Sequence, residues 1–404
     1  MKTSNRFSLS CIALALATGI VLAAPEARAD AITDWNLKAG ELIAESKLGT
    51  PPAVRAMAIV QTAAHEAVQA LEQRGPAQPA ALDAAIAAAH RAALLKLLPA
   101  QQAAIDAAFQ AALTGVPEGA AKAAALAAGE QAAATVLARR ADDVIAPETY
   151  RPHTTAGAYV PTAAPAATQW ALRKPWLMAS TAQFRPAPPP ALTSETWVRD
   201  FNEVKTLGAK VSARRSAEQT EIARFWEFSL PSIYHGVARS VALQPGRDVA
   251  RNARLFATVA QAMDDAMISV FEAKYHYNFW RPVTAIRNGD IDANEATERD
   301  PSWAPLIDSP LHAEYPSAHS ILAGAVGAVV RADVGKGAMP VLATSSPTAK
   351  GATRRWGSVE EFMREVASAR VYEGIHFRHS TEVGLRMGQQ IGDLAVEKLM
   401  QSSQ

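Results

Sequence analysis

The chain has 404 residues, of which 49% are hydrophobic and 20% are charged, which is the composition of a globular protein and not of a disordered one. Its 40 basic and 39 acidic side chains give a formal net charge of +1. A balance this close to zero argues against nucleic acid as a partner.

The first 29 residues have the pattern of an export signal. Basic residues precede an apolar run at 12–24, and the small-residue pattern "ARA" follows at 27–29. We predict cleavage after Ala29 and an exported mature chain, either periplasmic or secreted. The only cysteine, Cys11, lies in this segment, so we expect a mature chain without thiols or disulfides. No later stretch reaches the roughly 20 apolar residues of a membrane span.

Residues 30–146 are predicted to form an N-terminal, alanine-rich helical region. Between Pro51 and Leu71 the apolar residues recur every three or four positions, which is the helical period. Further alanine-dense segments follow, and Pro99 and Pro117 should end helices. We interpret this region as a scaffold with little chemistry.

Residues 147–192 are rich in proline and have no helical period, so we predict a connecting segment that wraps the molecule. Helical patterns return in residues 193–404, and no strand alternation persists. The expected fold class is therefore all-α, a large helical bundle. A last helix at about 379–400 carries Gly384, Gly388 and Gly392 at four-residue spacing, which predicts the close approach of another helix.

The stretch "EYPSAHS" at 314–320 precedes a long apolar run and reads as a helix start with Ser317 as the N-cap. The main-chain N–H groups of Ala318, His319 and Ser320 would then lie in the first turn, where helices bind anions. The sequence therefore predicts an anion site at this helix start.

Upstream, the stretch "KYHYNFWRP" places Lys274 and Arg281 seven residues apart. If this segment is helical, both cations project from nearly one face, about 10 Å apart along the axis. Pro282 should end or bend the helix. Such a pair by itself is typical of a solvated surface.

A third stretch, "ASARVYEGIHFRHSTEVG", contains Arg370 and His376 six residues apart. Gly374 lies between them and permits a break that would turn His376 toward the same point. A lone histidine of this kind is usually structural. Together, however, the three stretches offer the fixed donors that a tetrahedral oxyanion needs, and two imidazoles for bonding and proton transfer.

These stretches, in this order, resemble the signature blocks of the vanadium-dependent haloperoxidase and type 2 phosphatidic acid phosphatase (PAP2) superfamily: Lys-x6-Arg-Pro, Pro-Ser-Gly-His, and Ser-Arg-x5-His-x3-Asp. The stretch "QFRPAPPPALTSETWVRDFNEVKTLGAK" at 183–210 also resembles the soluble exported bacterial haloperoxidase-like branch. The resemblance implies that residues 193–404 form an oxyanion-binding helical domain of this type.

The resemblance also implies a role for each residue. Lys274, Arg281 and Arg370 would hold the equatorial oxygens of the oxyanion, assisted by the Ser317 hydroxyl and the amide of Ala318. His319 would act as the acid and base at the apical oxygen. His376 would be the covalent ligand, bound to vanadium in a haloperoxidase or forming a transient phosphohistidine in a phosphatase.

The chain departs from the family pattern at three positions. Ala318 replaces a glycine but retains its amide N–H. Position 369 is alanine where the family has serine, and Ser380 stands where the family has aspartate. If an acidic partner is required, Asp264 or Asp265 on the preceding helix would supply it. His312 lies five residues before Ser317. The resemblance implies that bromoperoxidases carry a second histidine there, where chloroperoxidases carry an aromatic residue. His312 either tunes the site toward bromide or caps a loop.

The favoured reading is a vanadate-dependent haloperoxidase that oxidises halide, preferably bromide, with hydrogen peroxide and passes it to an organic acceptor. A soluble acid phosphatase acting on a phosphate ester, with no cofactor required, remains the alternative. A non-catalytic anion- or metal-binding protein is a third reading, although the histidines lack a zinc-type spacing. The sequence leaves the formation of a homo-oligomer open.

Overall fold

The computed structural model describes residues 30–143 and 150–401 of the chain. The signal segment and its predicted cleavage site lie outside the described residues. The described residues form thirteen α-helices and one small sheet, which confirms the expected all-α class. None of these helices is long and apolar enough to cross a membrane.

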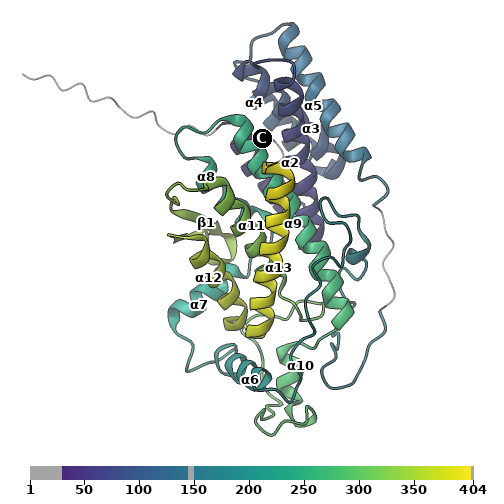
Figure 1. Cartoon of the computed structure of the whole chain (residues 1–404), viewed down its shortest axis with the longest axis vertical. Coiled ribbons are helices and arrows are strands. Elements are labelled where there is room, and N and C mark those ends of the chain that lie inside the picture. Colours follow the sequence, from purple (N-terminus) through teal and green to yellow (C-terminus); the bar gives the residue numbers. More distant parts are fainter. Residues whose placement is uncertain (1–29, 144–149, 402–404) are drawn as a thin grey trace, which may run out of the picture.

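The first five helices belong to the alanine-rich region, and α2 to α5 occupy one end of the molecule (Figure 1). Helices α3 and α4 end before Pro99 and Pro117, as the sequence predicts. Helix α2 packs against α3, α5 and the central helix α9, so this region shares the core of the rest of the chain. The bounds are α1 (Ala31–Glu45), α2 (Thr50–Glu72), α3 (Pro79–Leu97), α4 (Gln102–Ala112) and α5 (Ala120–Ala138).

The remaining helices surround α9, which packs against α2 on one side and α11 and α13 on another (Figure 1). Asp248 caps the start of α9 by accepting a hydrogen bond from the main-chain N–H of Arg251. The bounds are α6 (Glu195–Leu207), α7 (Ala217–Trp226), α8 (Pro231–Ala242), α9 (Val249–Tyr277), α10 (Pro282–Arg287), α11 (Ala318–Val334), α12 (Val359–Tyr372) and α13 (Arg378–Val396).

The described part of the proline-rich segment, residues 150–192, contains only one 3-10 turn, at Trp170–Leu172. Three tyrosine hydroxyls from the rest of the chain donate hydrogen bonds to main-chain carbonyls of this segment. These tyrosines are Tyr275, Tyr277 and Tyr315, and two of the sequence stretches singled out above contain them. The segment is therefore fastened to the elements that carry the candidate site.

A two-stranded antiparallel sheet in the described residues was not predicted from the sequence. Strand β1 (Leu342–Ser346) pairs with β2 (Ala352–Trp356), and β1 packs against α8. Each strand has five residues, and serine and threonine occupy most of β1. A run this short and polar carries too little alternation of apolar and polar residues to be recognised.

The glycines of the last helix lie against α11, as their spacing predicts. A Cβ at Gly384 would come within 2.7 Å of the Ser317 carbonyl oxygen, and one at Gly392 within 2.6 Å of the Ala325 oxygen. A Cβ at Gly388 would collide with the main-chain oxygen of Ile321. The backbones of α11 and α13 therefore approach closely, and the contact reaches the N-cap residue of α11.

We predict that Gly388→Ala lowers the free energy of unfolding by about 1–3 kcal/mol, because overpacking outweighs the better helix propensity of alanine. Urea denaturation measures the change. Gly49→Ala is the matched control, since a Cβ there meets nothing within 4 Å and should cost less than about 1 kcal/mol. An equal effect of the two substitutions would contradict the close approach.

His90 is a buried neutral imidazole in the alanine-rich region. Its Nδ1 lies 2.9 Å from the carbonyl oxygen of Ile86, and its ring stacks on Trp35 with centroids 5.1 Å apart. Burial lowers the pKa of His90 to about 4. The unfolded chain, with an ordinary histidine pKa near 6.5, therefore binds more protons than the folded protein between these two values.

We predict that protonation of His90 in the unfolded chain lowers the free energy of unfolding as pH decreases. The decrease should be about 1.4 kcal/mol per pH unit below about 6.5. Urea denaturation at pH 7, 6 and 5 would measure it in the wild type and in His90→Gln. The variant should lose this part of the slope, while other buried histidines cancel in the comparison. Parallel slopes would show that His90 accepts a proton in the folded protein.

Candidate active site

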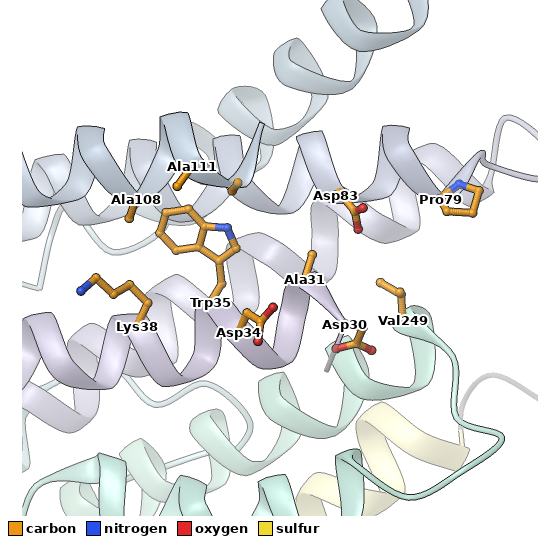
Figure 2. A pocket seen from close by; sticks show the side chains of 11 residues that line it. Asp30, Ala31, Asp34, Trp35, Lys38, Pro79, Asp83, Ala108, Ala111 and Val249 are labelled. Atoms are coloured by element: carbon orange, nitrogen blue, oxygen red, sulfur yellow. The ribbon is translucent and has the colours of Figure 1, made fainter. Parts of the chain in front are cut away.

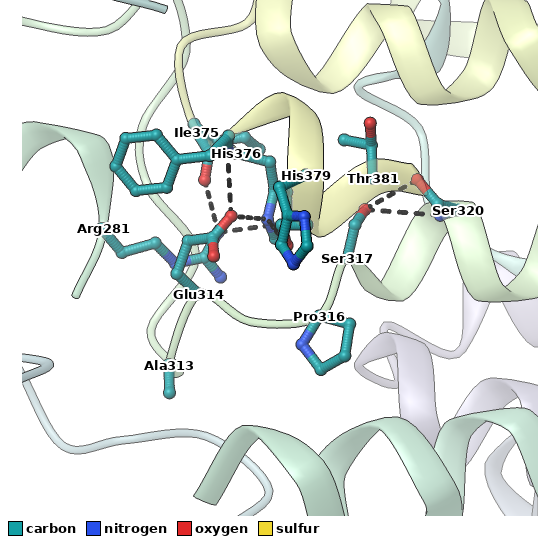
Figure 3. Close-up of polar contacts among 12 residues, drawn as sticks. Arg281, Ala313, Glu314, Pro316, Ser317, Ser320, Ile375, His376, His379 and Thr381 are labelled. Carbon is teal, nitrogen blue, oxygen red and sulfur yellow. Dashed lines mark hydrogen bonds and ion pairs between the residues drawn. The ribbon is translucent and has the colours of Figure 1, made fainter. Parts of the chain in front are cut away.

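Ser317 is the N-cap of α11, as predicted, and is fully buried. Its hydroxyl oxygen accepts a hydrogen bond from the Ser320 hydroxyl at 3.0 Å, and Ser320 N–H lies 3.4 Å away (Figure 3). Its own N–H donates to the carbonyl of Ser380 at 3.2 Å, which ties the start of α11 to α13. Ala318 and His319 follow in the first turn and are half-buried.

His376 lies in the turn between α12 and α13. Helix α12 ends at Tyr372, and Gly374 adopts a φ of +79°, a left-handed conformation that few other residues accept. This is the break that the sequence predicts. The ring of His376 is 2% exposed, with Nε2 3.2 Å from Arg281 Nη1.

Arg281 does not extend the helix that carries Lys274. Helix α9 ends at Tyr277, because Asn278 is left-handed with a φ of +47°, and Arg281 is the N-cap of α10. The expectation of two cations on one helical face is therefore wrong. The turn nevertheless brings the Arg281 guanidinium to His376 and to His312, whose Nδ1 lies 2.9 Å from Nη2.

Lys274 is fully buried, and its ammonium group donates to three main-chain carbonyls. Nζ lies 3.0 Å from the oxygen of Ala313, 2.8 Å from that of Glu314 and 2.5 Å from that of Pro316. An ammonium has three donors, so these carbonyls use all of them. Lys274 therefore holds the loop that leads into Ser317.

Arg370 and His319 both retain a buried nitrogen without a partner among the described residues. Arg370 Nη1 donates to the carbonyl of Trp226 at 2.8 Å and to Glu373 at 2.7 Å, whereas its Nε has no partner. His319 Nε2 has none either. Such nitrogens are rare in a protein interior and suit a site that receives an acceptor.

The carboxylate that contacts His376 is Glu314, which the sequence reasoning missed. Its Oε1 lies 2.7 Å from His376 Nδ1 and accepts the main-chain N–H of Phe377 at 3.0 Å (Figure 3). The sequence does hold a local signal for Glu373, the carboxylate partner of Arg370. Glu373 follows Arg370 by three residues, the spacing at which side chains meet on a helix. Glu314 stands in the stretch "EYPSAHS" itself, but its partner is 62 residues away.

Asp264 and Asp265 do not supply this contact. Asp264 Oδ2 accepts from Arg55 Nη1 and Trp176 Nε1, each at 2.7 Å. Asp265 accepts three main-chain N–H groups at residues 176–178. Both aspartates therefore anchor the proline-rich segment to α9 through these hydrogen bonds, about three turns before Lys274.

Burial controls the protonation of the whole cluster. It lowers the pKa of His376 well below the ordinary value, and the charges of Arg281, Lys274 and Arg370 lower it further. The pKa values of His319, His312 and Lys274 also fall, with burial as the largest cause. The contact between His376 and Glu314 is therefore a hydrogen bond from a neutral imidazole and not an ion pair.

The same burial acts on the two carboxyl groups in the opposite direction. It raises the pKa of Glu314 to about 7 and that of Glu373 to about 8, although neighbouring cations oppose both shifts. Three basic side chains thus share the cluster with at most two carboxylates. Because burial makes both carboxyl groups harder to ionise, they offset the guanidinium groups of Arg281 and Arg370 only in part, which favours an anion.

A separate cavity of about 720 Å³ lies between α1, α3, α4 and the start of α9 (Figure 2). Asp30, Asp34 and Asp83 line it beside Trp35, and it contains none of the predicted oxyanion donors. It is therefore not the candidate site. Among the described residues, no group of three or more histidine, cysteine, aspartate or glutamate side chains could hold a metal ion.

Comparison with known proteins relates the C-terminal helices to the vanadium chloroperoxidases, in agreement with the resemblance of the three sequence stretches. Residues 254–404 match the model of the VCPO second helical-bundle domain. The vanadium chloroperoxidase of Curvularia inaequalis is 30% identical in a match covering 30% of this chain and 23% of that protein. The match thus spans about a quarter of the length of that relative.

Two solved structures resemble most of the chain. A bacterial vanadium-dependent iodoperoxidase has a TM-score of 0.76 at 24% identity, covering 91% of this chain and 96% of that one. A bacterial vanadium-dependent chloroperoxidase, in its holo form, has a TM-score of 0.71 at 17% identity, covering 88% and 93%. These likenesses show a shared fold. The helices at residues 254–404, which contain the three stretches of the candidate site, therefore belong to the vanadium haloperoxidase type of helical bundle.

Proposed function

We propose that this protein is an exported vanadium-dependent haloperoxidase that oxidises halide with hydrogen peroxide. The observation that carries the proposal is the buried cluster of Lys274, Arg281 and Arg370 around a neutral imidazole, with no more than two carboxylates to balance it. Such a cluster is costly to bury unless an anion completes it.

The residues present fit vanadate. His376 keeps Nδ1 bonded to Glu314, and Nε2, which lies 3.2 Å from Arg281 Nη1, carries the lone pair that would bind vanadium in place of this contact. The unpartnered Nε of Arg370 and the forked guanidinium of Arg281 suit the oxygens of a tetrahedral anion, and the Ser317 hydroxyl and the Ala318 amide would add donors. Bound vanadate would supply a Lewis-acidic centre at which peroxide oxidises halide.

His319 would hold and move the proton of the reaction. Its Nε2 has no partner among the described residues, while main-chain groups of Trp226 and Phe228 hydrogen-bond to the ring. Those bonds orient the imidazole and leave one nitrogen for an oxygen of the substrate. Burial lowers the pKa of His319, so the ring is neutral and can accept a proton.

His312 supports a preference for bromide, which the relatives do not decide because they include iodo- and chloroperoxidases. Its ring contacts Arg281 through Nδ1 and packs edge-on against Phe271 with centroids 5.1 Å apart. It is thus placed to orient a guanidinium of the cradle. The aromatic residue that the resemblance implies for chloroperoxidases at this position would lack the hydrogen bond to Arg281, so we infer that the histidine favours bromide over chloride.

We predict that the purified mature chain brominates a phenolic dye with bromide and hydrogen peroxide only when orthovanadate is added. Excess phosphate should suppress the activity, because the same donors hold both anions. Dye absorbance measures the rate. Absence of bromination together with vanadate-inhibited hydrolysis of an aryl phosphate would assign the site to a phosphatase acting through His376.

His376→Ala identifies the residue responsible in either assay and should abolish turnover. His276→Ala is the matched control, because His276 is exposed on α9 near the site stretch. It should retain the wild-type rate. Unchanged activity of His376→Ala in a folded protein would remove His376 from the chemistry.

We predict that Arg370→Ala weakens vanadate binding by about 10- to 100-fold, because it removes a charge-assisted hydrogen bond worth about 1.5–3 kcal/mol. Equilibrium dialysis with elemental analysis of vanadium measures the dissociation constant. Arg331→Ala is the control, since Arg331 is paired with Glu360 at an exposed position. Equal dissociation constants for the two variants would exclude Arg370 from the anion site.

A further inference from the structure

We propose that Glu314 is the positioning residue of His376, supplying from the loop before α11 the carboxylate that Ser380 does not provide. The inference concerns the vanadium ligand of the proposed function and so rests on it. The geometry can nevertheless be tested without vanadate.

Glu314 fixes the tautomer of His376. Its Oε1 accepts two hydrogen bonds, from His376 Nδ1 at 2.7 Å and from the Phe377 N–H at 3.0 Å (Figure 3). The guanidinium of Arg281 can only donate, so His376 Nε2, which lies 3.2 Å from Arg281 Nη1, is an acceptor in the neutral ring. The proton must therefore reside on Nδ1, which leaves the Nε2 lone pair facing Arg281.

Ser380 cannot do this from the position where the family has aspartate. Its hydroxyl lies 3.5 Å from His376 Nδ1, at the limit of a hydrogen bond. A hydroxyl both donates and accepts, so it would permit either tautomer. A carboxylate oxygen accepts only, which is why Glu314 specifies the state and Ser380 does not.

Lys274 secures the loop that delivers Glu314. Its ammonium donates to the carbonyls of Ala313, Glu314 and Pro316, which surround the glutamate on both sides. Because all three donors are used, Lys274 acts on His376 through this loop. Glu314 also accepts the N–H of the N-cap residue Phe377, so it joins the loop before α11 to the start of α13.

Nitrogen NMR of histidine-labelled protein without vanadate tests the inference directly. The resonances of His376 are assigned by their loss in His376→Gln. In the wild type we expect protonated Nδ1 and unprotonated Nε2. The opposite tautomer in the wild type would overturn the proposal without any further variant.

Glu314→Leu should release the ring, so that the Nε2-protonated tautomer appears, and should weaken vanadate binding by about 10- to 100-fold. Glu360→Leu, at an exposed position, is the control and should change neither. An unchanged tautomer in folded Glu314→Leu would overturn the proposal. Because this readout needs no turnover, it separates the positioning role from the haloperoxidase assignment.

Rescue distinguishes positioning from packing. Glu314→Gln retains an acceptor oxygen that the Phe377 N–H holds in place, so it should keep the wild-type tautomer. In Glu314→Leu, a second substitution, Ser380→Asp, restores a carboxylate beside Nδ1 and should return both the tautomer and most of the vanadate affinity. Failure of both rescues would mean that Glu314 acts only by filling space.

Discussion

The structure depends on burying three basic side chains within one helical core. Lys274, Arg281 and Arg370 are at most 2% exposed, and a buried cation is tolerated only when its donors are satisfied. Main-chain carbonyls accept six hydrogen bonds from these side chains, and these carbonyls come from loops and helix ends, where they are free of helical hydrogen bonds. The irregular segments are therefore as necessary to the site as the helices.

The helices contribute to the site by bringing together the loops and helix ends that supply these carbonyls. Close packing of α11 on α13 through glycines places the N-cap Ser317 beside Ser380, four residues after His376. Helix α9 then presents Lys274 beneath the loop before Ser317. Tyrosines from the same stretches fasten the proline-rich segment around these elements. The helix packing and the buried ammonium of Lys274 thus both fix the short loop at residues 313–317.

The sequence predicted correctly those features of the fold that depend only on neighbouring residues in the chain. The start of α11 at Ser317 and the break at Gly374 follow from capping and backbone preferences, and both are confirmed. The end of α9 was misplaced because Asn278 adopts a left-handed conformation that no proline or glycine announces. The carbonyl partners of Lys274, and the partners Glu314 and Arg281 of His376, lie 39 to 95 residues away, and spacing along a helix cannot reveal them.

Glu314 shows why the substitution at Ser380 need not disable the site. The requirement at His376 is physical: one nitrogen must keep its proton so that the other keeps its lone pair. Any acceptor-only oxygen beside Nδ1 meets that requirement, whichever segment carries it. In this chain the loop before α11 carries it, and Lys274 holds that loop. A cation that the sequence led us to expect at the oxyanion instead donates to the loop that carries Glu314, the partner of the histidine that would bind vanadium.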